Sequence, residues 1–110
     1  MIPEVDAPTA RDLAAAGALL LDVREPNEWQ AGHAPDAQHL PMGEVTAALD
    51  TLPRDRRIVA VCRSGGRSGR VTEFLVAQGL DAVNLAGGMQ AWASAGLPVL
   101  TDDGTPGEVA

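Results

Sequence analysis

Short apolar runs alternate with amphipathic stretches along the chain, and this alternation predicts its secondary structure. The apolar runs are bounded by glycine, proline or charged residues, which is typical of buried strands. Strands are expected at residues 18–23, 37–40, 57–61 and 80–85. Helices are expected at residues 13–16, 26–29, 43–49, 69–78 and 87–95. A capping box over residues 9–12 precedes the first helix, and Ser68 is the expected N-cap of the fourth.

Strands that alternate with helices predict an α/β fold. We expect a mostly parallel central sheet of about five strands, flanked by helices on both faces. The chain of 110 residues suits one such domain, expected over residues 1–100. Residues 101–110 form an acidic tail containing glycine and proline, which we expect to be flexible. In parallel sheets of this kind a functional site lies beyond the carboxyl ends of the strands.

The amino-acid composition excludes several classes of binding partner. Fifteen acidic residues against eight basic ones give a net charge of −7, which opposes binding to nucleic acid or to an anionic membrane surface. No stretch approaches the ~20 apolar residues of a membrane span, and no signal peptide is visible, so we expect a cytoplasmic protein. His33 and His39 lack the spacing of a zinc site, and no metal is expected.

The single cysteine, Cys62, is the strongest candidate for chemistry. It stands directly after the predicted strand 57–61, and a loop rich in glycine and arginine, residues 63–69, follows it. Backbone N–H groups of such a loop, the positive end of the next helix, Arg63 and Arg67 would all stabilise a thiolate. Such surroundings lower a cysteine pKa from about 8.5 to between roughly 3.5 and 7.5. We therefore interpret Cys62 as a nucleophile, against the alternative of a buried structural cysteine.

Three blocks of sequence, spread over most of the chain, add to this interpretation. The first combines residues 21–29 (LDVREPNEW) with 32–37 (GHAPDA), the second is residues 62–68 (CRSGGRS), and the third combines residues 85–92 (LAGGMQAW) with 96–99 (GLPV). Their order and spacing resemble the signatures of the single-domain rhodaneses, which are persulfide-forming sulfurtransferases.

The resemblance implies an enzyme of the thiosulfate:cyanide sulfurtransferase type that needs no cofactor. By similarity, Cys62 attacks the outer sulfur of a small donor, thiosulfate or a persulfide, and holds that sulfur as its own persulfide. Cyanide, a cellular thiol or a protein acceptor then removes it, because the chain has no second cysteine to do so. The implied substrate-binding loop consists of Arg63, Ser64, Gly65, Gly66, Arg67 and Ser68.

Two alternative functions use the same residues. Phosphatases and arsenate reductases of the cysteine–loop–arginine type require five residues between cysteine and arginine. Four residues separate Cys62 from Arg67 here, and Ser68 holds the phosphatase arginine position, so we place sulfur transfer ahead of that chemistry. The other alternative is a sulfur-relay or regulatory module with a protein partner, which stays open. A domain that only binds is disfavoured by the presence of Cys62.

Charged residues near the end of the predicted strand 18–23 are candidates for orienting the loop. Asp22, Arg24 and Glu28 lie there, and we expect them to act on the loop through Arg67. The alternative is a paired network at the surface.

The remaining aromatic and histidine side chains are expected to be structural. The His33 ring is expected to bond to the backbone of its turn, and His39 is expected to be structural too. Trp29 and Trp92 are expected to pack in the core or at its rim. Asp36 stands where the family commonly has glycine, and aspartate tolerates the left-handed conformation of such a turn.

Overall fold

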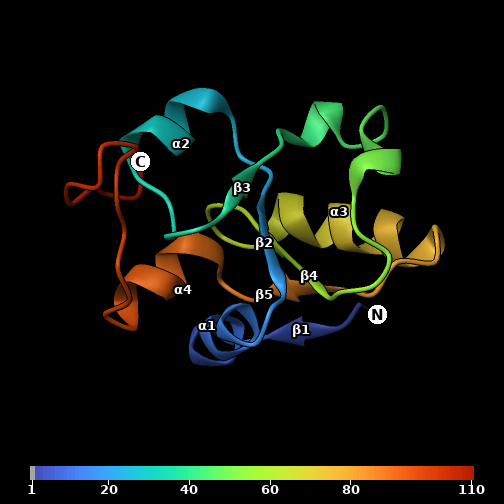
Figure 1. Ribbon diagram of the computed structural model, residues 1–110. Coiled ribbons are helices and arrows are strands. Elements are labelled where there is room, and N and C mark those ends of the chain that lie inside the picture. The colour runs from blue at the N-terminus through green and yellow to red at the C-terminus, as the bar shows by residue number, and fades with distance from the viewer. Residues whose placement is uncertain (1) are drawn as a thin grey trace.

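The computed structural model describes residues 2–110, which fold around a central sheet of five parallel strands (Figure 1). The strands in spatial order are β1 (Glu4–Val5), β5 (Ala82–Leu85), β4 (Ile58–Val61), β2 (Leu19–Asp22) and β3 (Gln38–His39). The α-helices are α1 (Ala7–Ala15), α2 (Pro26–Ala31), α3 (Gly66–Ala77) and α4 (Gly88–Ser94). Two short 3₁₀ helices are η1 (Met42–Glu44) and η2 (Leu49–Thr51). The expected α/β class and parallel sheet are confirmed.

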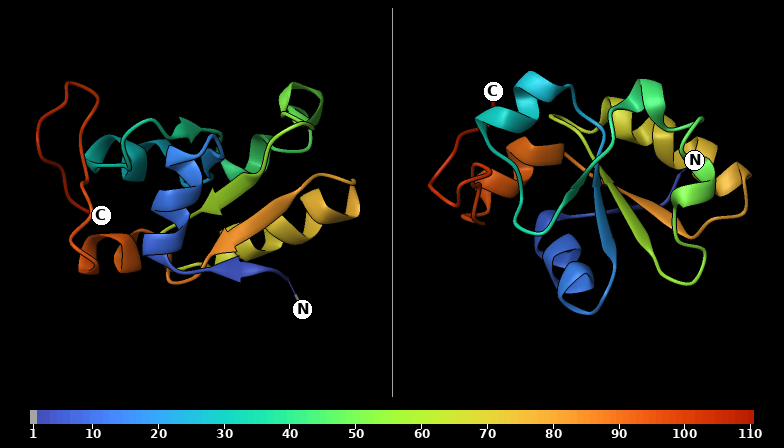
Figure 2. Two further views of the ribbon diagram at one scale, coloured as in Figure 1. Left: turned by 60° about the horizontal axis from the view of Figure 1, so that its bottom comes forward. Right: turned by 45° about the horizontal axis from the view of Figure 1, so that its top comes forward.

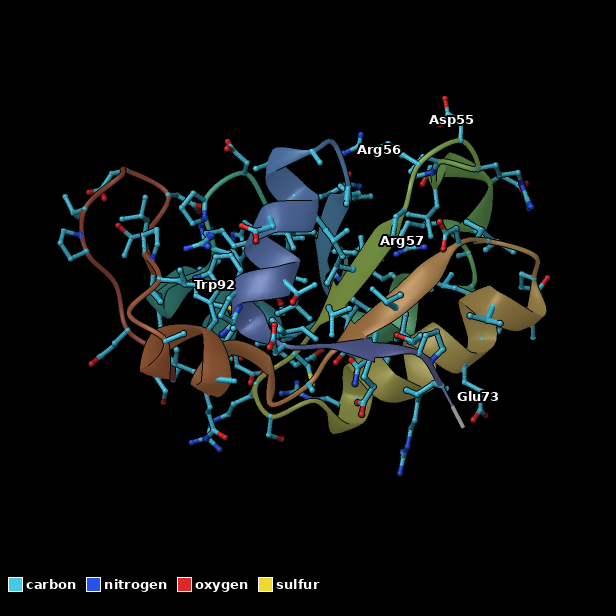
Figure 3. The ribbon with its side chains drawn as sticks, turned by 90° about the horizontal axis from the view of Figure 1, so that it is seen from below. Asp55, Arg56, Arg57, Glu73 and Trp92 are labelled. Carbon is cyan, nitrogen blue, oxygen red and sulfur yellow. The ribbon has the colours of Figure 1, made fainter. Side chains whose placement is uncertain are left out.

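The register of the central strands brings the candidate residues to one edge of the sheet. Every residue of β2, β4 and β5 is buried, as their apolar runs predict. Asp22 lies opposite Val61, so Cys62 begins the loop just beyond the carboxyl ends of β2 and β4. Arg57 precedes β4 and therefore lies at the other end of that strand (Figure 3).

Helices cover both faces of the sheet. In the right view of Figure 2, α1 and α4 lie to the left of the strands, whereas α3 and residues 42–51 lie to the right. One buried cluster joins alternate strand residues such as Leu21 and Ile58 to α3 through Leu75. The second cluster joins the other side of the strands to α1 and α4 and contains Leu20 and Trp92. Trp92 is 3% exposed and lies beside α1 (Figure 3), which confirms its expected packing role.

The first helix begins earlier than the sequence predicted. α1 starts at Ala7, and the Asp6 carboxylate caps it by accepting a hydrogen bond from Thr9 N at 2.9 Å. The predicted capping box over residues 9–12 is therefore wrong. Pro8 does not stop the helix, because the first turn of a helix needs no N–H donor from that position.

Two other elements differ from the prediction. The expected helix at residues 43–49 is instead a pair of 3₁₀ turns, η1 and η2. Gly43, Val45 and Thr46 all have low helix propensity, which accounts for the difference. The strand β1 was not predicted, since its two residues show no pattern of their own and are ordered by pairing with β5.

The turn before β3 contains the one non-glycine residue among residues 2–110 with a left-handed backbone. Asp36 has φ 63°, which confirms that aspartate takes the conformation expected at this position. The side chain is short and polar, so the cost of the conformation is small and the turn is preserved.

The segment after α4 runs back across the domain. Leu100 pairs with His33, Gly107 N donates to Val99 O at 2.8 Å, and Glu108 N donates to Ala31 O at 3.0 Å. These contacts hold residues 99–108 against the end of α2, and the flexibility expected for residues 101–110 stays a prediction. None of the helices in the described part of the chain is long and apolar enough to cross a membrane.

Candidate functional site

Cys62 lies at the junction of β4 and α3 and is 1% exposed. α3 begins at Gly66, so the predicted start after Ser68 is wrong and the loop between strand and helix is short. The reason is Gly65, which precedes the helix with φ 105°, a left-handed conformation that favours glycine. The chain therefore turns sharply after Cys62 and points the N-terminus of α3 back at the sulfur.

Of the groups expected to stabilise a thiolate, the loop N–H groups reach the sulfur, whereas Arg63 and Arg67 bind Ala110 O and Glu28. Gly65 N donates to Cys62 Sγ at 3.1 Å, and the Ser68 hydroxyl lies 3.2 Å from the same atom. Burial by itself raises the pKa of the Cys62 thiol, but hydrogen bonds from the Ser68 hydroxyl and from the N–H groups of Ser68, Gly65 and Ser64 outweigh it. The pKa of Cys62 is consequently lowered, which increases the fraction of thiolate at a given pH.

A second glycine turn packs against the loop that follows Cys62. Met89 N donates to Cys62 O at 2.8 Å, and Gln90 N donates to Arg63 O at 3.0 Å. Gly88 has φ 57°, and a Cβ at this position would overlap the backbone of Cys62 and Arg63. The glycine pair in the third sequence block thus lets the start of α4 pack directly on the loop and fix its path.

Arg67 is held by Glu28 of α2 rather than pointing freely into solvent. Its Nη1 and Nη2 donate to the two carboxylate oxygens at 2.7 Å and 2.8 Å, the bidentate geometry that arginine favours. The hydrogen bonds from Arg67 lower the pKa of Glu28 to about 2 from 4.5, while burial acts in the opposite direction. Glu28 also accepts a hydrogen bond from Glu25 N at 3.1 Å, which fixes the carboxylate on α2. The pair ties α2 to the first turn of α3.

Replacing Glu28 with glutamine is expected to remove an acid-sensitive contribution to stability. The pKa of Glu28 is about 2 in the folded protein and 4.5 in the unfolded chain. Its contribution to the free energy of unfolding is therefore complete above pH 4.5 and disappears as the pH falls towards 2. Urea unfolding across this range should show the wild-type free energy of unfolding falling more steeply than that of Glu28→Gln. Equal pH dependence in both proteins would mean that the Glu28–Arg67 pair contributes nothing to stability.

Asp22 and Arg24 form a buried ion pair next to this contact. Arg24 is 0% exposed and Asp22 is 1% exposed, and Arg24 Nη2 lies 2.8 Å from Asp22 Oδ2. Arg24 Nη2 also donates to Gly32 O at 2.8 Å, which anchors the end of α2. Of the three residues expected to orient the loop, Glu28 is the one that binds Arg67 directly. The orienting role stays a prediction, with Asp22 and Arg24 acting through the position of α2.

The exposed part of the loop faces outward. Arg63, Ser64 and Gly66 are exposed, in contrast to the buried Cys62 and Ser68. Arg63 Nε donates to Ala110 O at 2.9 Å. One side of the loop therefore exposes polar groups to solvent, and the other side covers the buried sulfur of Cys62.

The histidines pack on Trp29 near the end of α2. The Trp29 ring stacks on His33 with centroids 3.5 Å apart and on His39 at 4.9 Å. His33 Nδ1 lies 3.2 Å from Ala34 O, and His39 Nε2 lies 2.7 Å from Arg24 O. These backbone contacts agree with the structural roles expected from the sequence.

The sequence is similar to a known protein family over most of its length. The family model of the rhodanese-like domain matches residues 6–95. The chain belongs to the rhodanese-like domain family. A protein of Allochromatium vinosum named as a sulfurtransferase is 39% identical over 107 residues, covering 94% of this chain and 100% of that protein.

Solved structures of rhodanese-like proteins share the fold closely. The crystal structure of a rhodanese-related protein from Thermoplasma volcanium has a TM-score of 0.86 and 32% sequence identity, covering 91% of this chain and 99% of the other. A rhodanese-like domain protein from Staphylococcus aureus has a TM-score of 0.77 and 31% identity, covering 83% and 91% of the two chains.

Sequence reasoning missed two residues that touch this rhodanese-like site. Asn84 of β5 is 1% exposed and binds Gly65 O and the Ser68 hydroxyl, and Glu4 of β1 binds Asn84 in turn. The available signal was a single amide in the apolar run 80–85, because a buried polar side chain needs partners. Among residues 2–110 no group of three or more histidine, cysteine or acidic side chains gathers as a metal site, and cofactor independence stays a prediction.

Proposed function

We propose that this rhodanese-like domain is a sulfurtransferase that carries a sulfur atom on Cys62. The observation that supports it most is the surroundings of the sulfur: a thiolate favoured by Gly65 N, Ser68 and the N-terminus of α3, in a chain of the rhodanese-like family. A thiolate is the form of cysteine that attacks sulfur.

The proposed reaction has two displacement steps. The Cys62 thiolate attacks the outer sulfur of thiosulfate, a new S–S bond forms, and sulfite leaves with the electron pair of the bond that breaks. A second nucleophile, cyanide or a thiolate, then attacks the outer sulfur of the persulfide, and Cys62 leaves as a thiolate. The chain's own contribution is to stabilise that thiolate at the start and at the end, and no external oxidant or reductant is consumed.

The alternative of phosphoryl or arsenate transfer is disfavoured by the state of Arg67. A phosphatase of the cysteine–loop–arginine type needs its arginine to bind the oxygens of the transferred group. Here both ends of the Arg67 guanidinium are occupied by Glu28 at 2.7 Å and 2.8 Å. Arg63 uses Nε to bind Ala110 O, and its positive charge on the exposed side of the loop can attract an anionic donor against the net charge of −7.

A sulfur relay with a protein donor is the second candidate for the physiological role. Cys62 is 1% exposed, so a bulky donor needs to present its sulfur at the loop, whereas thiosulfate is small. The test compares two donors at equal concentration: thiosulfate with cyanide, measured as thiocyanate, and a protein carrying a persulfide. Turnover with thiosulfate supports the small-donor enzyme, transfer from the protein alone supports the relay, and transfer from neither contradicts both.

A further inference from the structure

The Ser68 hydroxyl lies between two hydrogen-bond acceptors in the interior of the domain. Its oxygen is 2.6 Å from Asn84 Oδ1 and 3.2 Å from Cys62 Sγ. Ser68 is 0% exposed, and Asn84 and Cys62 are each 1% exposed, so bulk solvent does not compete for these groups. A hydroxyl has one proton, and it can therefore serve the amide or the sulfur but not both fully at once.

The orientation of the Asn84 amide is determined by its other neighbours. Nδ2 donates to Glu4 Oε2 at 2.8 Å and to Gly65 O at 3.1 Å, and a carboxylate and a backbone carbonyl can only accept. Both protons of the amide nitrogen are used in this way. Oδ1 is consequently the atom that faces Ser68, and Asn84 acts as an acceptor towards the hydroxyl.

We propose that the Ser68 hydroxyl has two positions, turned to Cys62 Sγ when the sulfur is a thiolate and to Asn84 when the sulfur carries no charge, and that Asn84 is a positioning residue for the nucleophile. No proton is transferred in this motion, since only the O–H bond of Ser68 rotates. Glu4, from the short edge strand β1, takes part by holding the amide in the required orientation.

The charge on the sulfur decides which position is favoured. A thiolate is an ionic acceptor and attracts the hydroxyl more strongly than a neutral amide oxygen does. A thiol, or the inner sulfur of a persulfide, is a weak acceptor, and the short contact to Asn84 is then preferred. Asn84 thus stabilises the uncharged states of Cys62 relative to the thiolate. The persulfide part of this statement rests on the proposed sulfur transfer, whereas the thiol part requires only that Cys62 ionises.

Other charged groups lie near the sulfur. They are Arg63 and Arg67 on the loop and α3, Glu28 of α2 with its neighbour Glu25, and Glu4 of β1 beyond Asn84. None of them is substituted below, but Asn84→Leu removes the amide that binds Glu4. The double variant separates this change from the proposed one, because an effect of Glu4 on Cys62 would persist without the Ser68 hydroxyl.

The test measures how pH affects the alkylation rate of the sole cysteine with iodoacetamide, in the absence of any sulfur donor. Ser68→Ala removes the donor to the thiolate, so the midpoint of the profile should rise by about one to two pH units. Asn84→Leu removes the competing acceptor, so the midpoint should fall by about half to one pH unit. In the double variant the Asn84 substitution should add nothing to the effect of Ser68→Ala. Asn84→Val replaces Asn84→Leu if the larger side chain prevents folding.

Thr72→Val is the matched control, because it removes another buried hydroxyl from the next turn of α3. Thr72 Oγ1 donates to Ser68 O at 2.8 Å and does not touch the Ser68 side chain. This variant should lose thermal stability with an unchanged alkylation midpoint. Shifts of the same sign in Ser68→Ala and Asn84→Leu, or an Asn84 effect that persists without the serine hydroxyl, would overturn the proposal. Since no donor is present, either outcome is separate from a failure of sulfur transfer itself.

Discussion

Replacing Cys62 with serine is expected to abolish sulfur transfer while leaving the fold nearly intact. The proposed route requires a covalent bond between the attacking atom and the transferred sulfur, and a serine hydroxyl at neutral pH is neither ionised nor a good nucleophile towards sulfur. We expect the rate to fall below about one thousandth of the wild-type rate. The substitution changes one buried atom, and Gly65 N can still donate to the new hydroxyl, so the free energy of unfolding should change by no more than about 1 kcal/mol.

Two measurements check this expectation together. Thiocyanate formation from thiosulfate and cyanide reports the chemistry, and urea unfolding of the same preparation reports the fold. Loss of turnover in a stable protein assigns the chemistry to the sulfur atom. Turnover retained in Cys62→Ser would contradict the assignment of the nucleophile, because the chain has no other cysteine.

Breaking the buried ion pair by Asp22→Asn is expected to cost about 3 to 5 kcal/mol of stability. The substitution keeps the size of the side chain but leaves the Arg24 guanidinium charged in a site that is 0% exposed. Within the described part of the chain, Arg24 Nη1 has no hydrogen-bond partner, so the cation depends on Asp22 and on Gly32 O. A domain of this size is stable by about 5 to 15 kcal/mol, and the loss is therefore a large share of the total.

A double variant separates the charge from the shape. Asp22→Leu with Arg24→Met replaces the pair by apolar side chains and should recover most of the stability lost in the single variant, because no uncompensated charge remains buried. Urea unfolding of the wild type, Asp22→Asn and the double variant provides the comparison. A loss below about 1 kcal/mol in the single variant would mean that the pair behaves like an exposed one.

The sequence predicted the elements whose signal is local. The runs that form β2, β4 and β5 are mainly apolar and every residue in them is buried, so their position follows from hydrophobicity. The same pattern places Cys62 at a strand end. β1 was not predicted because two residues show no periodicity and become a strand only by pairing with β5.

The boundaries of helices were less predictable than their existence. Ser68 is a common N-cap residue, yet α3 begins at Gly66 because Gly65 takes the left-handed turn. That shift of the helix moves the Ser68 side chain from a capping role to the sulfur, where it lies 3.2 Å from Sγ. The preference of serine for N-cap positions does not reveal where the Ser68 side chain lies, because that position depends on how the loop packs against Gly88.

The candidate site was predictable in its chemistry but not in its supporting contacts. Cys62 and the loop follow from spacing and from the family resemblance, whereas Asn84 and Glu4 come from strands far away in the sequence. Their contacts to the loop depend on the order β1–β5–β4 in the sheet. That order is a tertiary feature without a local signature.

The central claim is that Cys62 carries the transferred sulfur, and the mass of the intact protein after incubation with thiosulfate tests it most directly. A persulfide adds one sulfur, about 32 Da, at the sole cysteine. We expect a single addition of this size that cyanide reverses and that Cys62→Ser does not show. No addition from thiosulfate or from a persulfide-bearing protein, under conditions where iodoacetamide alkylates Cys62, would contradict the claim.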